Sequence, residues 1–208
     1  MNPSNHSLEV LKDVGIILIR QKESLLELLS PLHLPHKYSI ETAGGHHILS
    51  VSEERHSSRN ELNEGQRLRV LNPSHIEVFT IHRPHNVSTT EYLVQVGEEK
   101  IGSVVNDPQW TRTCLHLTDS HGNTMFTLKG PTYESFGGNG GERRYPLISK
   151  SEDAEVGLIA RYPRNPVSEH ISNADTYRIE FPPDLTVNMK ATLITAAIVI
   201  DFIEYERN

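Results

Sequence analysis

Apolar and polar residues alternate in short runs along most of the chain. In the run at 176–181, Tyr177, Ile179 and Phe181 fall on one side of an extended backbone, and polar residues fall on the other. Because successive side chains of a β-strand point to opposite faces, this alternation predicts a strand with one buried face. Alternation, or a run rich in β-branched residues, predicts strands at 14–21, 37–42, 47–52, 67–71, 77–82, 92–96, 100–105, 113–118, 125–129, 155–161 and 176–181.

Turn-forming residues separate these runs. Gly44-Gly45, Asn72-Pro73 and the segment 119–123 each lie between two predicted strands. Glycine, proline, asparagine and aspartate favour turns because they supply or tolerate the backbone angles that turns require. Short strands at this spacing indicate a β-sandwich or a β-barrel.

The end of the chain has a different pattern. At 190–206 the apolar side chains would cover most of the circumference of a helix instead of one stripe. Such a helix is either buried on all sides or lies in a membrane. The uncharged run at 191–200 has 10 residues and ends at Asp201, whereas a membrane span needs roughly 20 apolar residues. We therefore predict a buried helix.

A barrel closed around this helix would bury both the helix and the inner faces of the strands, and closure removes exposed sheet edges. Pro182-Pro183 ends the last strand, and Asp184 is the predicted cap of the helix. We expect residues 1–12 to form a flexible polar tail and residues 13–208 to form one domain.

The net charge limits the class of binding partner, and the cysteine content indicates the cellular compartment. A formal net charge of −7 at pH 7 argues against nonspecific nucleic-acid binding. It also opposes docking on an anionic membrane unless basic residues cluster or a cation bridges the two surfaces. Cys114 is the single cysteine, which excludes an intramolecular disulfide and is typical of a reducing compartment. No secretory signal is visible at the amino end, so we expect a cytoplasmic protein.

The carboxyl end also carries an extended motif. An Asx-Ala-Asp segment with an aromatic residue precedes Ile-x-Phe-Pro-x-Asp-Leu-x-Val-x-Met-Lys-Ala and an apolar run that closes on Asp-Phe. The motif residues are Asn173, Ala174, Asp175, Tyr177, Ile179, Phe181, Pro182, Asp184, Leu185, Val187, Met189, Lys190, Ala191, Asp201 and Phe202. This motif resembles the carboxyl end of the phospholipid scramblases. The resemblance covers 14–206 and includes Arg83-Pro84, Ile101-Gly102, Trp110, Gly130-Pro131 and Val156-Gly157.

The resemblance implies a fold, an activity and a location. It implies a tubby-like fold, a closed antiparallel β-barrel around a central hydrophobic helix. It also implies calcium-dependent, ATP-independent, bidirectional movement of phospholipids between leaflets. The location that it implies is peripheral, at the inner face of membranes and above all of the plasma membrane. The family's cysteine cluster and proline-rich extension are missing, so lipid anchoring is not carried over. The alternative function is a tubby-like adaptor that binds phosphoinositides or proteins and has no transport activity.

A calcium segment of the family maps to residues 173–184. The candidate Ca²⁺ ligands are Asn173, Asp175, Glu180 and Asp184, since a hard cation prefers oxygen ligands. Arg178 stands where an EF-hand loop needs glycine, and the alternation predicts a strand in the middle of the segment. We therefore expect a weak site, with a dissociation constant of about 10⁻⁴–10⁻³ M. The alternative is a barrel strand with acidic ends.

Other residue clusters give weaker signals. Close histidine sets at 33–36, 46–47 and 82–85 lie on no predicted helix, and Cys114 is alone, so we expect solvated histidines instead of zinc ligands. The most basic stretch would either meet phosphoinositide headgroups or form a solvated face; it comprises Lys129, Arg143, Arg144, Lys150, Arg161 and Arg164. The sequence contains no nucleophile motif, and we do not expect an enzyme.

Overall fold

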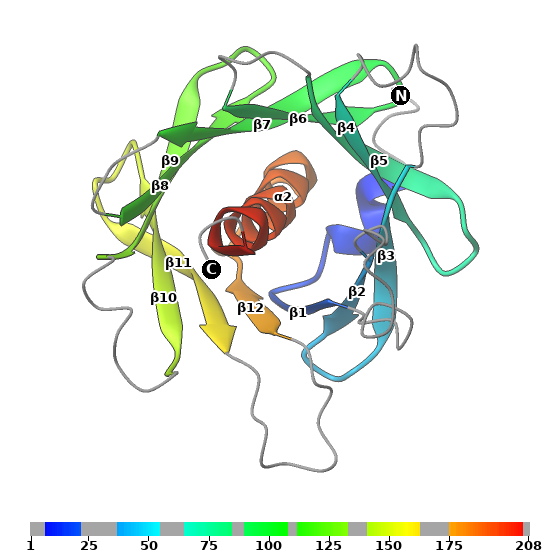
Figure 1. The fold of residues 1–208 in the computed structure, drawn as a ribbon, viewed down its shortest axis with the longest axis horizontal. Helices are drawn as coiled ribbons and strands as arrows, with labels where there is room; N and C mark the ends of the chain where they lie inside the picture. The colour runs from blue at the N-terminus through cyan, green and yellow to red at the C-terminus, as the bar shows by residue number, and fades with distance from the viewer. Residues whose placement is uncertain are drawn as a thin grey trace.

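A closed barrel surrounds one helix. The computed structural model describes residues 7–21, 37–54, 65–84, 90–107, 112–132, 141–162 and 175–205. In these residues twelve strands form an antiparallel barrel, and helix α2 (Val187–Tyr205) lies at its centre (Figure 1). The strands are β1 (Ile16–Gln21), β2 (Lys37–Thr42), β3 (His47–Glu53), β4 (Gln66–Leu71), β5 (Glu77–Arg83), β6 (Glu91–Val96), β7 (Glu99–Asp107), β8 (Arg112–Asp119), β9 (Thr124–Thr132), β10 (Arg143–Ser149), β11 (Glu155–Tyr162) and β12 (Thr176–Glu180).

The strand order follows the sequence. Each strand pairs with the strands before and after it, and β1 closes the barrel by pairing with both β2 and β12. Closure leaves no strand of this sheet with an unpaired edge. The structure therefore confirms the predicted tubby-like barrel, and the predicted strands correspond to β1–β9, β11 and β12, with ends that differ by a few residues.

Strand β10 is absent from the sequence prediction. Two arginines and Pro146 hide its alternation, yet Tyr145 and Leu147 are fully buried and point to the same face. Pro146 has no N–H to donate to a sheet. It is tolerated here because it faces Leu158 of β11, while the pairs with β9 begin only at Leu147.

Helix α2 confirms the predicted buried helix. Every residue from 189 to 204 is buried, and the helix packs against β6, β7, β8 and β12. Within the described parts of the chain, no helix is long and apolar enough to cross a membrane. The cap differs from the prediction, because the Met189 N–H donates to Thr186 Oγ1 at 3.3 Å while Asp184 lies in the preceding turn with a φ of 61°.

The expected flexible tail is wrong from Leu8 onward. Leu8–Leu11 form a short 3₁₀ helix, η1, in which Leu8 and Leu11 are fully buried against α2. The Lys190 ammonium of α2 then donates to the main-chain oxygens of Leu11, Lys12 and Val14 at 2.8–2.9 Å. Two leucines three positions apart thus place this segment in the core, and residues 1–6 lie outside the described structure.

Gly102, from the Ile-Gly motif, lets the helix approach the sheet closely. A Cβ atom at Gly102 would lie 2.5 Å from Thr192 Oγ1 of α2 and 2.8 Å from the Thr118 carbonyl oxygen of β8. Real Cβ atoms do not approach oxygen atoms so closely, and overpacking of this kind costs about 1–3 kcal/mol. The glycine of this motif therefore has a packing role.

Candidate functional site

Among the residues that the structure describes, the predicted calcium ligands Asp175 and Asp184 do not come together. Asp175 directly precedes β12 and Asp184 follows it, so this strand of 5 residues separates their carboxylates. At about 3.3 Å per residue the strand alone spans roughly 16 Å, whereas calcium lies about 2.3–2.6 Å from its oxygen ligands. One ion therefore does not reach both carboxylates. Asn173 lies outside the described residues.

Two of these carboxylates have arginine partners. Asp175 Oδ2 accepts a hydrogen bond from Arg161 Nη2 at 2.5 Å, and the Glu180 carboxylate pairs with Arg178 on the same strand. A cation at either position would have to compete with a guanidinium. Asp184 is exposed, and it is therefore the predicted ligand that best suits binding of an external ion.

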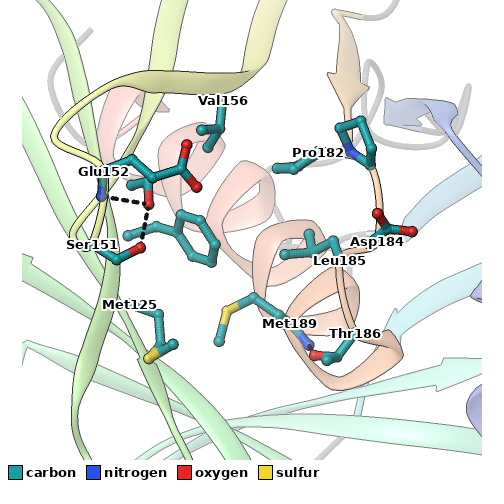
Figure 2. Close-up of a pocket in the computed structure, with 12 residues that line it drawn as sticks. Met125, Ser151, Glu152, Val156, Pro182, Asp184, Leu185, Thr186 and Met189 are labelled. Atoms are coloured by element: carbon teal, nitrogen blue, oxygen red, sulfur yellow. Dashed lines mark hydrogen bonds between the residues drawn. The ribbon is translucent and has the colours of Figure 1, made fainter.

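Asp184 lies at the edge of a pocket. The cavity measures about 250 Å³ and is formed by β9, the turn after β10, β11 and the start of α2. In Figure 2, Val156, Leu185 and Met189 line its interior, and the carboxylates of Glu152 and Asp184 lie on opposite sides. The complete lining is Met125, Phe126, Ser149, Ser151, Glu152, Val156, Pro182, Pro183, Asp184, Leu185, Thr186 and Met189.

The chemistry of this pocket suits part of an amphipathic molecule. Its volume is below the range of about 300–1,000 Å³ that is common for pockets of complete small-molecule ligands, so it would hold part of a larger ligand. The apolar interior favours a hydrocarbon group. Glu152 and Asp184 make the rim negative, so an anionic group at the mouth would be repelled unless a cation lay between them.

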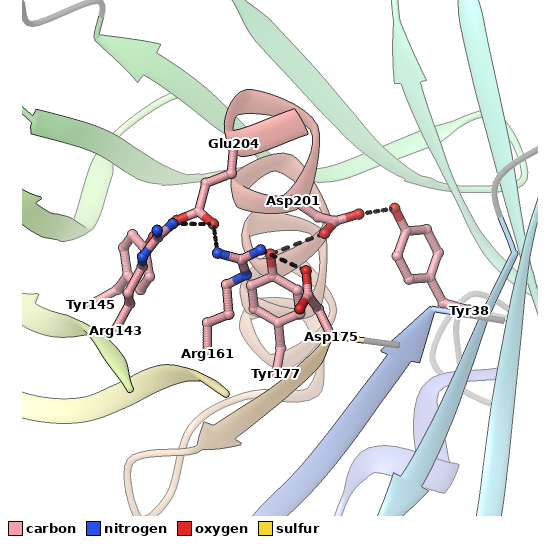
Figure 3. Close-up of polar contacts among 8 residues, drawn as sticks. All are labelled: Tyr38, Arg143, Tyr145, Arg161, Asp175, Tyr177, Asp201 and Glu204. Carbon is pink, nitrogen blue, oxygen red and sulfur yellow. Dashed lines mark hydrogen bonds and ion pairs between the residues drawn. The ribbon is translucent and has the colours of Figure 1, made fainter. Parts of the chain in front are cut away.

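The opposite end of α2 contains a buried polar cluster, which Figure 3 shows. Asp201 is 7% exposed and accepts hydrogen bonds from the hydroxyls of Tyr38 at 2.7 Å and Tyr177 at 3.0 Å. Burial raises the pKa of Asp201, and the two tyrosine hydrogen bonds partly oppose this shift. Burial together with Asp201 also raises the pKa of both tyrosines, so they donate as neutral hydroxyls.

Glu204 gathers a second set of donors in the same cluster. Its carboxylate accepts from Arg143 Nη1 at 3.0 Å, from Arg161 and from the Tyr145 hydroxyl. Its side chain is only 3% exposed. Burial and the nearby Glu204 charge raise the pKa of Tyr145. These residues tie β10, β11 and α2 together, and the carboxylate oxygens already accept protein donors, so the cluster is structural.

The predicted basic stretch is divided between two environments. Arg143 and Arg161 face Glu204 inside the barrel, whereas Arg144 is exposed and lies 3.7 Å from Glu142. Arg164 lies outside the described residues. Of the histidine sets, His33, His36 and His85 also lie outside them, and His46 and His47 are exposed. His47 Nε2 lies 3.0 Å from Ser50 Oγ.

Sequence reasoning missed most of the pocket residues. Met125, Glu152 and Val156 come from three separate elements, and only Asp184 among the pocket residues was predicted to bind a ligand. No local pattern in the sequence marks these residues as a group. They come together only because the barrel places the β10–β11 turn opposite the start of α2.

Comparisons with known proteins show which family the sequence matches. The Scramblase family model matches residues 1–207. Phospholipid scramblase 1 is 28% identical in Rattus norvegicus and 27% identical in Homo sapiens, each over 96% of this chain and over 62% and 65% of the relative. Human phospholipid scramblase family member 5 is 27% identical over 97% of this chain and 78% of the relative. The chain thus spans less than two thirds of the length of the two phospholipid scramblase 1 proteins.

A solved structure supports the architecture. An X-ray structure of a protein from Arabidopsis thaliana superposes with a TM-score of 0.51 at 13% identity, over 92% of this chain and 93% of the other. At this identity the likeness shows the fold alone. The Scramblase family match covers nearly the whole chain. This chain therefore belongs to the scramblase family.

Proposed function

We propose that this protein promotes calcium-dependent, ATP-independent, bidirectional movement of phospholipids between membrane leaflets. The observation that carries the proposal is the match of the Scramblase family model to residues 1–207. The related proteins named above are phospholipid scramblases by name. The action requires no covalent chemistry, so we propose a lipid transporter and not an enzyme.

The pocket beside Asp184 gives this proposal a physical basis. Its apolar interior suits a segment of an acyl chain, and its rim carries Glu152 and Asp184. A phosphate group that follows the acyl chain to the rim would meet two negative charges. A calcium ion bound between carboxylate and phosphate would remove this repulsion, which explains why lipid binding would depend on calcium.

Asp184 is the carboxylate that we assign to calcium. Asp175 and Glu180 each pair with an arginine, whereas Asp184 is exposed and borders the pocket. A site with few protein carboxylates and solvent ligands should bind weakly, with a dissociation constant of about 10⁻⁴–10⁻³ M. The protein would act as a peripheral protein at the cytosolic, inner face of membranes, where calcium would offset part of its charge of −7.

One observation favours a second function. Helix α2 is buried inside the barrel, and no described helix is long and apolar enough to cross a membrane. A headgroup that crosses a bilayer needs a polar route through the hydrocarbon, and α2 supplies none in this fold. The alternative is therefore an adaptor at the membrane surface that binds phosphoinositides or proteins and does not move lipids.

A fluorescent-lipid scrambling assay in liposomes separates these functions. Purified protein should increase lipid exchange between leaflets with millimolar calcium and not with a chelator. Asp184→Asn should lose most of the calcium response, whereas the matched control Glu98→Gln, which changes an exposed carboxylate in the β6–β7 turn, should keep it. Calcium-dependent binding to the liposomes without lipid exchange would support the adaptor. If the protein neither bound the liposomes nor exchanged their lipids, both the transport function and the lipid-binding adaptor would be overturned.

A further inference from the structure

Three side chains of types that can ligate a metal lie together on the outward-facing side of β7 and β8, separate from the pocket. Asp107 is the last residue of β7, and Cys114 and His116 lie on β8. One ligand atom from each of these residues lies within 4.8 Å of the other two. We propose that Asp107, Cys114 and His116 form a Zn²⁺ site in which water completes the coordination.

The pairing of β7 with β8 creates this arrangement. Asp107 is directly opposite Cys114, and His116 is opposite Val105. Leu115 and Leu117 point into the core, so Cys114 and His116 point to the outer face. Asp107 faces one of them directly and the other diagonally, and both positions are within reach of cross-strand side chains. The antiparallel pairing therefore places three potential ligands side by side, although the sequence of this segment shows no metal-binding motif.

The distances are close to those of a zinc site. Zinc–sulfur bonds of about 2.3 Å and zinc–nitrogen or zinc–oxygen bonds of about 2.0–2.2 Å place tetrahedral ligands about 3.3–3.6 Å apart. His116 Nε2 lies 3.8 Å from Asp107 Oδ2, and the three ligand atoms all lie within 4.8 Å of one another. Small rotations about side-chain bonds would therefore bring the three ligands onto one ion.

The imidazole is oriented for this role. His116 Nδ1 lies 3.2 Å from Thr127 Oγ1 on β9. When Nδ1 carries the proton and donates to Thr127, Nε2 keeps its lone pair and faces Asp107. Histidine ligands of metals almost always have such a partner on the other ring nitrogen, which fixes the tautomer and the ring orientation.

The ligand types favour a transition-metal ion over calcium or magnesium. A thiolate and an imidazole favour zinc, whereas calcium and magnesium prefer oxygen ligands alone. A deprotonated Cys114 and Asp107 carry two negative charges, which balance Zn²⁺. Cys114 is 2% exposed, while the side chains of His116 and Asp107 are 34% and 45% exposed. The sulfur is thus shielded, and the opposite side of the site is open for the ion and a water molecule to enter.

Cobalt provides a test that reports on this cysteine alone. Co²⁺ substitutes for zinc in tetrahedral sites, and a cobalt–thiolate bond gives charge-transfer absorption that histidine and carboxylate ligands do not produce. Because Cys114 is the single cysteine, a band in the purified protein identifies this site. We expect the band in wild type, its loss on addition of excess zinc, and no band in Cys114→Ser.

Two further variants separate binding from folding. His116→Ala keeps the cysteine and should weaken zinc binding more than Thr127→Val, which removes the orienting partner and should weaken it about 10–100-fold. The matched control His121→Ala, in the exposed β8–β9 turn, should bind zinc as wild type does. Absence of the cobalt band in wild type with native circular dichroism would overturn the proposal, as would zinc affinity that is equal in wild type, Cys114→Ser and His116→Ala.

Discussion

The two ends of helix α2 both place charges inside the barrel, but they hold them differently. At the amino-terminal end the Lys190 ammonium donates to the main-chain oxygens of Leu11, Lys12 and Val14. At the carboxyl-terminal end Asp201 and Glu204 bind tyrosine and arginine side chains from distant strands. The amino-terminal end also borders the pocket, whereas the carboxyl-terminal end is filled by the polar cluster of Figure 3.

The signs of these charges show that the helix dipole does not stabilise them. A helix dipole favours anions near its amino terminus and cations near its carboxyl terminus, by about 0.3–1 kcal/mol per charge. Lys190 lies in the first turn, and Asp201 and Glu204 lie in the last two, so each charge opposes the dipole. Tertiary partners must therefore stabilise them. The carboxyl-terminal end is a structural junction, and the amino-terminal end is the place where the fold leaves room for a ligand.

The largest effect on stability should come from a substitution in the apolar middle of α2, between its two ends. Ile198 is 1% exposed, and Ile198→Asp would lose about 1.5–3 kcal/mol of burial and place an unpaired charge in the core, at a cost of several kcal/mol more. Because whole domains are stable by only about 5–15 kcal/mol, we expect little folded protein in the soluble fraction. Ile76→Asp is the control, since Ile76 is 63% exposed. Native-like circular dichroism of Ile198→Asp would contradict the central position of α2.

The next effect tests the carboxyl-terminal junction. Glu204→Gln leaves Arg143 and Arg161 without the carboxylate that they share, and breaking a buried ion pair costs about 3–5 kcal/mol. Glu180→Gln is the matched control, because its pair with Arg178 lies at the surface and should be worth at most about 1 kcal/mol. Urea denaturation measures both free energies of unfolding. Equal losses would show that the junction is not the stronger of the two.

The sequence was sufficient for eleven strands and for the helix because these depend on local patterns, whereas closure of the barrel was inferred from the buried helix and from the family resemblance. Alternation marks a strand wherever one face is buried, and an apolar surface on all sides marks a buried helix. The pattern failed at β10, where Arg143, Arg144 and Pro146 interrupt it, and at η1, where Leu8 and Leu11 alone are fully buried.

The sites were less predictable because their residues meet across strands. Tyr38 and Asp201 are 163 positions apart in sequence, and alternation tells which face a side chain occupies but not what it faces. The calcium hypothesis assumed that neighbours in sequence share an ion, whereas β12 holds Asp175 and Asp184 apart. For the same reason Cys114 looked isolated until β7 and β8 were paired.

A smaller effect should appear in the pH dependence of stability. Burial raises the pKa of Asp201 above its unfolded value of about 4. The folded state therefore binds this proton more tightly, so the contribution of Asp201 is full below pH of about 4 and is lost as the pH rises through the folded pKa. The stability of wild type relative to Asp201→Asn should fall as pH rises through this window, measured by urea denaturation at each pH.

Asp119 provides a control of opposite sign. Hydrogen bonds from Asn123 lower the pKa of Asp119. Its contribution is therefore present above the unfolded pKa and is lost as the pH falls through the folded pKa. The stability of wild type relative to Asp119→Asn should rise with pH, and the same slope for both variants would contradict the effect of burial at Asp201.

The smallest effect on stability, and the most informative about function, should come from Asp184→Asn. Asp184 is exposed with a φ of 61°, a conformation that asparagine tolerates, so the free energy of unfolding should change by at most about 0.5 kcal/mol. Asp175→Asn removes the charge that pairs with Arg161 and should cost about 1.5–3 kcal/mol. Calcium titration by calorimetry should give the reverse order, with the larger loss of affinity in Asp184→Asn. If Asp175→Asn lost calcium affinity while Asp184→Asn kept it, the ion would bind at the carboxyl-terminal junction, and the pocket would not be the calcium-dependent end of the barrel.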